Sequence, residues 1–118
     1  MELRHILKSK IHMAAITKTV LDYGGSIGID SAILEASGII ANERVQVLNF
    51  NNGQRIETYV IEEEKNSGTV ALYGPAARCG SPGDRISILS YVLADEETAK
   101  KIKPVIIMLN GENRVGGS

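Results

Sequence analysis

The chain has 118 residues, and its 13 lysines and arginines against 14 aspartates and glutamates give a formal net charge of −1 at pH 7. This length predicts one domain, residues 1–118, with one core. The balanced charge excludes the broad positive field that nucleic acid or an anionic membrane would need. The single cysteine, Cys79, excludes an internal disulfide. Because the sequence has neither a signal-peptide pattern nor an apolar run of membrane-spanning length, we expect a cytoplasmic protein.

Short apolar stretches, many of them β-branched, predict a chain made mainly of β-strands. In chain order they span residues 3–7, 11–20, 27–29, 45–50, 56–61, 70–72, 86–92 and 105–109. Asp30 and Ser31 followed by residues 32–36 predict an N-capped short helix, and residues 94–101 predict another. Residues 110–118 are rich in glycine and polar side chains, so we expect this tail to be loosely held.

Turn sequences separate several of these strands. They are Asn51-Asn52-Gly53, Lys65-Asn66-Ser67-Gly68 and Ser81-Pro82-Gly83-Asp84. Each contains residues that suit a positive φ or a preset turn, so we expect a hairpin at each. Short strands with tight connections predict a small closed β-barrel with short helical caps, because closure removes the exposed strand edges.

The run Tyr23-Gly24-Gly25-Ser26 leads into the strand predicted at residues 27–29. Two glycines let the backbone reach conformations that strain other residues, so the Ser26 hydroxyl can approach the Gly25 carbonyl. Attack there turns the amide into an ester, and β-elimination then leaves Ser26 as a pyruvoyl group. A glycine-rich hairpin turn with an ordinary turn serine is the alternative interpretation.

Lys10 and His12 stand two residues apart in a predicted strand. Their side chains therefore share one face, while Ile11 points to the other. The pair either lines a pocket or forms a solvated polar face. A metal site is not favoured, because His5 and His12 have no third ligand at a suitable spacing.

Arg55, Thr58 and Tyr59 follow the first predicted turn. Strand alternation places Arg55 and Tyr59 on one face and Thr58 on the other, so Thr58 joins them only if the strand is distorted. The Arg55 guanidinium suits a carboxylate, and the Tyr59 phenol can donate a proton. The alternative is a strand in which the tyrosine packs and the arginine is solvated.

The sequence Tyr73-Gly74-Pro75-Ala76-Ala77-Arg78 follows another predicted strand. Small residues and a proline can begin a helical turn whose backbone N–H groups bind an anion. A plain loop stiffened by the proline is the alternative.

Taken in order, these segments resemble the aspartate 1-decarboxylase family, pyruvoyl-dependent enzymes that make β-alanine for pantothenate biosynthesis. The resemblance extends from Leu7 to about Leu109 and rests on Leu7-Lys8-Ser9-Lys10-Ile11-His12, Leu21-Asp22-Tyr23, Gly25-Ser26, Ile29-Asp30, Asn51-Asn52-Gly53, Glu57-Thr58-Tyr59, Gly74-Pro75-Ala76-Ala77-Arg78 and Pro82-Gly83-Asp84. It implies a six-stranded double-psi β-barrel. It also implies a homotetramer with active sites between subunits.

The resemblance implies that the chain cleaves itself after Gly25 into residues 1–25, the β chain, and residues 26–118, the α chain. Ser26 would become the pyruvoyl group, which condenses with the amine of L-aspartate, and no metal is implied. Thr58 matches a residue that stabilises the oxyanion of cleavage, and Tyr59 matches a proton donor. The remaining matches are the carboxylate-binding cations Lys10 and Arg55, the substrate-binding His12, Gly74, Pro75, Ala76 and Ala77, and the pocket residue Tyr23. Tyr73 stands at a further position beside the pocket.

The sequence departs from the family pattern at four positions. Gly24 and Gly28 stand where valine and threonine are usual, Met13 replaces an arginine, and Tyr73 replaces an asparagine. These departures keep two alternatives open: a poorly processed structural or regulatory proprotein of the same fold, and a pyruvoyl decarboxylase for another amino acid. The sequence also leaves open whether cleavage needs a maturation factor.

Overall fold

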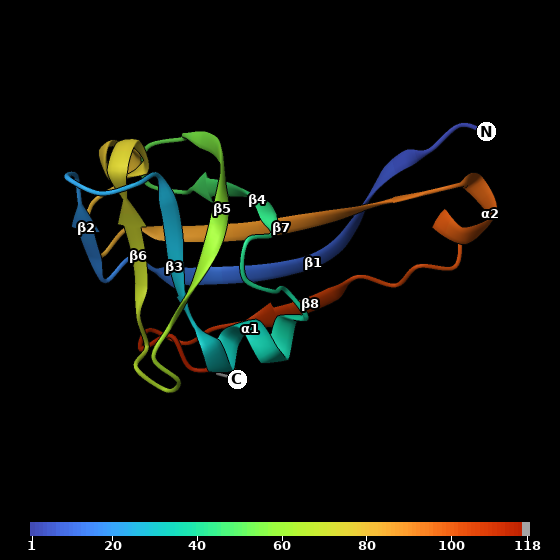
Figure 1. Ribbon diagram of the computed structural model, residues 1–118. Helices are drawn as coiled ribbons and strands as arrows, with labels where there is room; N and C mark the ends of the chain where they lie inside the picture. Colours follow the sequence, from blue (N-terminus) through green and yellow to red (C-terminus); the bar gives the residue numbers. More distant parts are fainter. Residues whose placement is uncertain (117–118) are drawn as a thin grey trace.

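A computed structural model describes residues 1–116 and places eight strands in one mixed sheet, in the order β2-β6-β3-β5-β4-β7-β1-β8 (Figure 1). The strands are β1 (Arg4–Ala15), β2 (Lys18–Val20), β3 (Ser26–Asp30), β4 (Arg44–Asn49), β5 (Arg55–Glu63), β6 (Val70–Tyr73), β7 (Arg85–Ala94) and β8 (Val105–Met108). Two α-helices, α1 (Ser31–Ser37) and α2 (Glu96–Ala99), and the 3-10 helix η1 (Gly74–Cys79) connect them. The predicted mainly β class is confirmed.

The sheet curls on itself where β1 runs into β2. These strands stand near opposite ends of the strand order, yet only Ile16 and Thr17 separate them in the chain. The N–H of Thr17 donates to the Val70 carbonyl on β6, and the N–H of Ile16 donates to the Asp84 carbonyl. The curled sheet surrounds a buried apolar core that includes Ile11, Ile16, Ile27, Ile29, Val45, Val60, Val70, Leu72, Ile86 and Ile88. The double-psi type of barrel stays a prediction.

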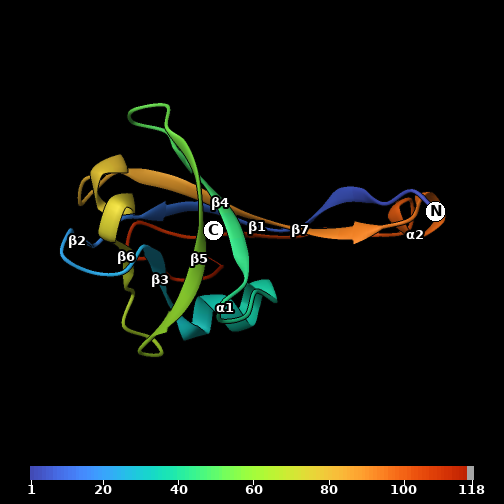
Figure 2. The same ribbon diagram turned by 45° about the horizontal axis from the view of Figure 1, so that its top comes forward.

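The strand count differs from the expected six. The stretches predicted at residues 3–7 and 11–20 form the long strand β1 and the short strand β2 instead, with the break at Ile16. Beyond the curled body, the first half of β1 and the last half of β7 pair as a two-stranded arm that ends at α2 (Figures 1 and 2). Apolar side chains are exposed along this arm at Leu3, Tyr91 and Leu93.

The turn at residues 51–53 is a hairpin between the paired strands β4 and β5, with Gly53 at φ 75°. The other two predicted hairpins are wrong. Residues 65–68 join β5 to β6, but β3 lies between these two strands in the sheet. Residues 81–84 join η1 to β7. Turn residues determine that the chain reverses locally, but they do not determine which strand inserts between the two that they connect.

The predicted helix after Asp30 is confirmed as α1. The Asp30 carboxylate accepts a hydrogen bond of 2.8 Å from the N–H of Ala32, and the helix ends at Gly38 with φ 74°. The second predicted helix is shorter than expected, since α2 has only four residues and is capped by Asp95. No helix within residues 1–116 is long and apolar enough to cross a membrane.

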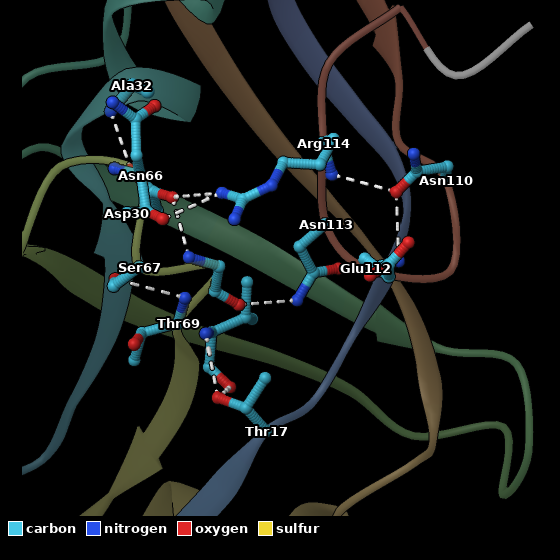
Figure 3. Close-up of polar contacts among 12 residues, drawn as sticks. Thr17, Asp30, Ala32, Asn66, Ser67, Thr69, Asn110, Glu112, Asn113 and Arg114 are labelled. Carbon is cyan, nitrogen blue, oxygen red and sulfur yellow. Dashed lines mark hydrogen bonds and ion pairs between the residues drawn. The ribbon is translucent and has the colours of Figure 1, made fainter.

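Most of the predicted loose tail is held in place, which corrects that expectation for residues 110–116. The buried Asn113 side chain donates hydrogen bonds to the carbonyls of Ala15 and Gly68, at 2.8 and 2.9 Å. Arg114 lies 3.9 Å from the buried Asp30 carboxylate (Figure 3). The Asn113 side chain, although polar, is buried and satisfies backbone carbonyls in the interior. Residues 117–118 lie outside the described residues.

Candidate active site

A pocket of about 450 Å³ opens beside the Gly25–Ser26 peptide bond. Its lining residues are Gly25, Ile56, Glu57, Thr58, Tyr59, Pro75, Ala76 and Cys79. The fold therefore brings together residues from three segments that the sequence analysis singled out separately. Cys79, which the sequence analysis did not include in the site, lines the pocket from the end of η1.

Thr58 and Tyr59 both reach this pocket although they lie on opposite faces of β5. The predicted distortion of the strand is wrong, because the pairing of β4 with β5 runs without a break from Arg55 to Tyr59. On its other side, β5 pairs with β3 only from Val60 onward. The edge of β5 at residues 56–59 is therefore free of a neighbouring strand, and side chains from both of its faces border the pocket.

Ser26 is the first residue of β3 and is fully buried. Its Oγ has no hydrogen-bond partner among residues 1–116. A buried hydroxyl without a partner costs about 1–3 kcal/mol, so such groups in native structures call for an explanation. Free of a competing hydrogen bond and adjacent in the chain to the pocket residue Gly25, this hydroxyl is suited to act as a nucleophile.

Gly74 brings the start of η1 against the backbone before Ser26. It has φ 66°, and a Cβ there would lie 2.6 Å from the Tyr23 carbonyl oxygen and 2.9 Å from Gly25 Cα. Only glycine permits both this conformation and this approach. Pro75 follows at the first turn of η1, which confirms the predicted helical turn. Ala77 belongs to the same turn but does not line the pocket.

Tyr73 and Tyr23 lie beside the pocket without lining it. The Tyr73 hydroxyl donates a hydrogen bond of 2.6 Å to Glu63 Oε2, and its ring lies 4.7 Å from the Tyr23 ring between centroids. Glu63 is not among the residues predicted from the sequence for this site. The signal was available in β5, because Tyr59, Ile61 and Glu63 alternate along one face of that strand.

Three predicted site residues lie apart from this pocket. His12 Nδ1 is 2.9 Å from Ser87 Oγ, and Arg55 donates a hydrogen bond of 2.8 Å to Gln46. The half-buried Lys10 and His12 flank the buried Ile11 on β1, which confirms their predicted common face. Within residues 1–116, no lysine or arginine of this chain therefore lines the pocket.

The acidic side chain at the pocket edge is already paired. Arg44 donates a hydrogen bond of 2.6 Å to Glu57, and this guanidinium lowers the pKa of the Glu57 carboxyl. The ion pair offsets the negative charge that would repel an anionic ligand. Within residues 1–116, no cluster of histidine, cysteine or acidic side chains is arranged to hold a metal ion.

The protein is a small β protein. Its buried serine without a hydrogen-bond partner lies next to a pocket, which indicates a candidate enzyme site. The family model for aspartate decarboxylase matches residues 1–116. The chain belongs to the aspartate decarboxylase family, which confirms the predicted resemblance.

Curated relatives are similar to this chain over nearly its full length. The aspartate 1-decarboxylase of Cytophaga hutchinsonii is 52% identical over 110 residues, which cover 93% of this chain and 96% of the relative. The enzyme of the same name from Caldicellulosiruptor bescii is 50% identical, with 93% and 86% covered. That of Clostridium beijerinckii is 46% identical, with 93% and 89% covered.

Proposed function

We propose that this protein is an aspartate 1-decarboxylase, which converts L-aspartate to β-alanine and carbon dioxide for pantothenate biosynthesis. Family membership and the names of its full-length relatives support the activity. The observation that carries the proposal is the buried, unpartnered Ser26 hydroxyl beside a pocket lined by Gly25, Thr58 and Tyr59. The hydroxyls of Ser26, Thr58 and Tyr59 and the backbone carbonyl of Gly25 are the groups that the proposed reaction needs.

The first step in this proposal is cleavage of the chain by its own residues. Ser26 Oγ adds to the Gly25 carbonyl carbon, the C–N bond breaks, and the acyl group moves from nitrogen to oxygen. Loss of the Ser26 Cα proton then expels the Gly25 carboxylate and leaves a dehydroalanine. Water replaces its amino group, ammonia leaves, and the new terminus is a pyruvoyl group. The products are residues 1–25 and residues 26–118.

Thr58 is the proposed stabiliser of the oxyanion in this cleavage. Its side chain lines the same pocket as Gly25, whose carbonyl oxygen acquires the negative charge during attack. A hydroxyl aimed at that oxygen lowers the barrier because it interacts most strongly with the developing charge. The close approach of Gly74 to the Tyr23 carbonyl limits the movement of the segment under attack.

The site formed by cleavage supports decarboxylation. A pyruvoyl group supplies an electrophilic carbonyl for an amine and withdraws electrons as carbon dioxide leaves. Tyr59, half exposed at 42% and lining the pocket, holds the proton that replaces the lost carboxylate. The ion pair of Glu57 with Arg44 reduces its repulsion of the carboxylate that aspartate retains.

Binding the retained carboxylate requires a cation from outside this pocket. We assign this role to Arg55 and Lys10 in an assembly of several copies, with His12 beside them. The exposed apolar side chains on the arm and along the edge strand β8 support self-association, as does the unpaired edge of β8. In this proposal the protein is a homotetramer whose sites form between neighbouring subunits.

A substrate panel tests this assignment. Purified protein incubated with L-aspartate, L-glutamate and other amino acids should release carbon dioxide from L-aspartate and accumulate β-alanine. Preference for another amino acid would support the alternative substrate, and an uncut, inactive chain would support the proprotein. The alternative of another amino-acid substrate rests on Gly24 and Tyr73, and neither residue lines the pocket within the single chain.

A further inference from the structure

Gly28, Glu63 and Tyr73 occupy one small volume next to the cleavage site. A Cβ at Gly28 would overlap the Glu63 carboxylate and lie 2.8 Å from Tyr73 Cε2. A side chain at this position of β3 is therefore incompatible with the hydrogen bond between Glu63 and Tyr73. Two of the departures from the family pattern, Gly28 and Tyr73, belong to one arrangement, with Glu63 as its third member.

This arrangement lies on the same face of β3 as the reacting serine. Ser26 and Gly28 are two residues apart on β3, so both face the same side. Ser26 pairs directly with Tyr73 on the antiparallel strand β6. The Tyr73 ring extends from its position opposite Ser26 toward Gly28, where its hydroxyl meets Glu63. Glu63 thus fixes the residue that faces the nucleophile across the sheet.

The same tyrosine contacts the glycine-containing segment before the scissile bond. Tyr23 is 59% exposed, and its ring rests at a tilt of 45° on the Tyr73 ring. Gly24 and Gly25 follow, and a Cβ at Gly24 would meet nothing within 4 Å. Stacking on Tyr73 therefore restricts a segment in which two glycines leave the backbone free. Burial and Glu63 both raise the pKa of Tyr73, which keeps its hydroxyl protonated as the donor.

We propose, on the basis of the function proposed above, that Glu63 is a positioning residue for self-cleavage. Its carboxylate holds Tyr73, Tyr73 holds the Tyr23 ring, and this contact keeps the Gly25 carbonyl within reach of Ser26. Attack within a chain depends strongly on how often the two groups reach the reactive geometry. Loss of the Glu63 carboxylate lowers that frequency without removing a reacting group.

Cleavage kinetics test this proposal. Wild-type and variant chains are made by cell-free translation, and intact mass follows the uncut fraction with time. Glu63→Ala and Tyr73→Phe should each slow cleavage about tenfold, the size expected for losing a hydrogen bond to a charged group. The double variant should cleave no more slowly than either single variant, because both remove the same contact. Glu63→Gln, which keeps an acceptor, should restore most of the rate.

Glu62→Ala is the matched control, because this neighbouring side chain is exposed and follows the opposite alternation on β5. It should cleave at the wild-type rate. Once cleaved, the Glu63→Ala protein should show wild-type kcat and KM for L-aspartate. A wild-type rate for Glu63→Ala would overturn this inference alone, as would equal slowing by Glu62→Ala. A wild-type chain that never cleaves would overturn both this inference and the proposed function.

Discussion

The Tyr73 hydroxyl hydrogen-bonds Glu63 at 2.6 Å, and the ring of this tyrosine lies against Gly28 instead of lining the pocket beside Gly25. The sequence shows only that a large phenol replaces a small amide next to the site. In the structure, the phenol has an acceptor on β5 and a glycine on β3 that makes room for it. The Tyr73 side chain is therefore accommodated outside the pocket lining.

The contact with Glu63 should be visible in a pH titration. Burial, together with the Glu63 carboxylate, raises the pKa of Tyr73 well above the usual value for tyrosine. The ultraviolet difference between wild type and Tyr73→Phe should show one phenol ionising above this usual value. The stability that the protonated Tyr73 contributes is fully present below about pH 10, the pKa of tyrosine in the unfolded chain. It decreases as the pH rises toward the higher pKa of Tyr73 in the folded protein. Ionisation at or below about pH 10 would contradict the contact.

Ser26→Ala should give an uncut chain with an unchanged fold. The substitution removes the Ser26 hydroxyl, which is the proposed nucleophile. The methyl group of alanine is small enough to fit the same buried position. Intact mass reports cleavage, and circular dichroism reports the fold. Ser81→Ala, at an exposed turn, should cleave normally and serves as the control. Recovery of the two fragments from Ser26→Ala would refute the assignment.

Tyr59→Phe should cleave normally but turn over aspartate slowly. The variant keeps the ring in the pocket and loses the proton, so kcat per cleaved chain should fall about a hundredfold, a usual size for losing a general acid. Cleavage of the same variant at the wild-type rate, measured by intact mass, is the control for its fold. Unchanged kcat in Tyr59→Phe would remove Tyr59 from the proton-donor role.

Gly74→Ala should impair cleavage, and Gly83→Ala should not. Both glycines have positive φ, at 66° and 94°, so alanine strains the backbone at each and costs about 1 kcal/mol of stability. Only at Gly74 would the added Cβ also overlap the Tyr23 carbonyl and displace the segment before Ser26. Cleavage rates of the two variants, measured by intact mass, separate these effects. Equal rates would show that the close approach is not needed.

Asp30→Asn should destabilise the protein by about 3 kcal/mol, because the buried carboxylate is held by several donors. Burial raises the pKa of Asp30. Hydrogen bonds from the amides of Gly68, Ala32 and Asn66, together with the charge of Arg114, outweigh burial, so the pKa of Asp30 is lowered (Figure 3).

The stability contributed by Asp30 is present above its unfolded pKa of about 4 and is lost as pH falls through the lower folded value. Chemical denaturation of wild type and Asp30→Asn between neutral and acidic pH measures this dependence. The difference in unfolding free energy should shrink toward low pH. A difference that stays constant with pH would contradict the assigned ionisation.

Local features of the structure could be predicted from the sequence because they depend on neighbours in the chain. Asp30 signals the cap of α1, Gly53 signals the β4–β5 hairpin, and alternation around Ile11 places Lys10 and His12 on one face. Each of these depends on a few consecutive residues. The chemical roles proposed for Gly25 and Ser26 likewise come from a local sequence.

Features that depend on strand order could not be predicted. The insertion of β3 between β5 and β6 pairs segments that lie more than 30 residues apart, and turn chemistry carries no information about it. That insertion leaves the edge of β5 open and brings Thr58 and Tyr59 to one pocket without a bulge. It also places Glu63 beside Gly28. The prediction of a loose tail is wrong for the same reason. The hydrogen-bond partners of Asn113, at Ala15 and Gly68, lie far from it in the chain.

The proposed function requires that the active protein has broken its own backbone after Gly25. Intact mass spectrometry of the purified wild-type protein, combined with an aspartate turnover assay on the same sample, tests it most directly. We expect two fragments, residues 1–25 and 26–118, with the larger one blocked to Edman degradation and reducible by borohydride. A sample that converts aspartate to β-alanine while its chain remains continuous from Met1 to Ser118 would contradict the claim.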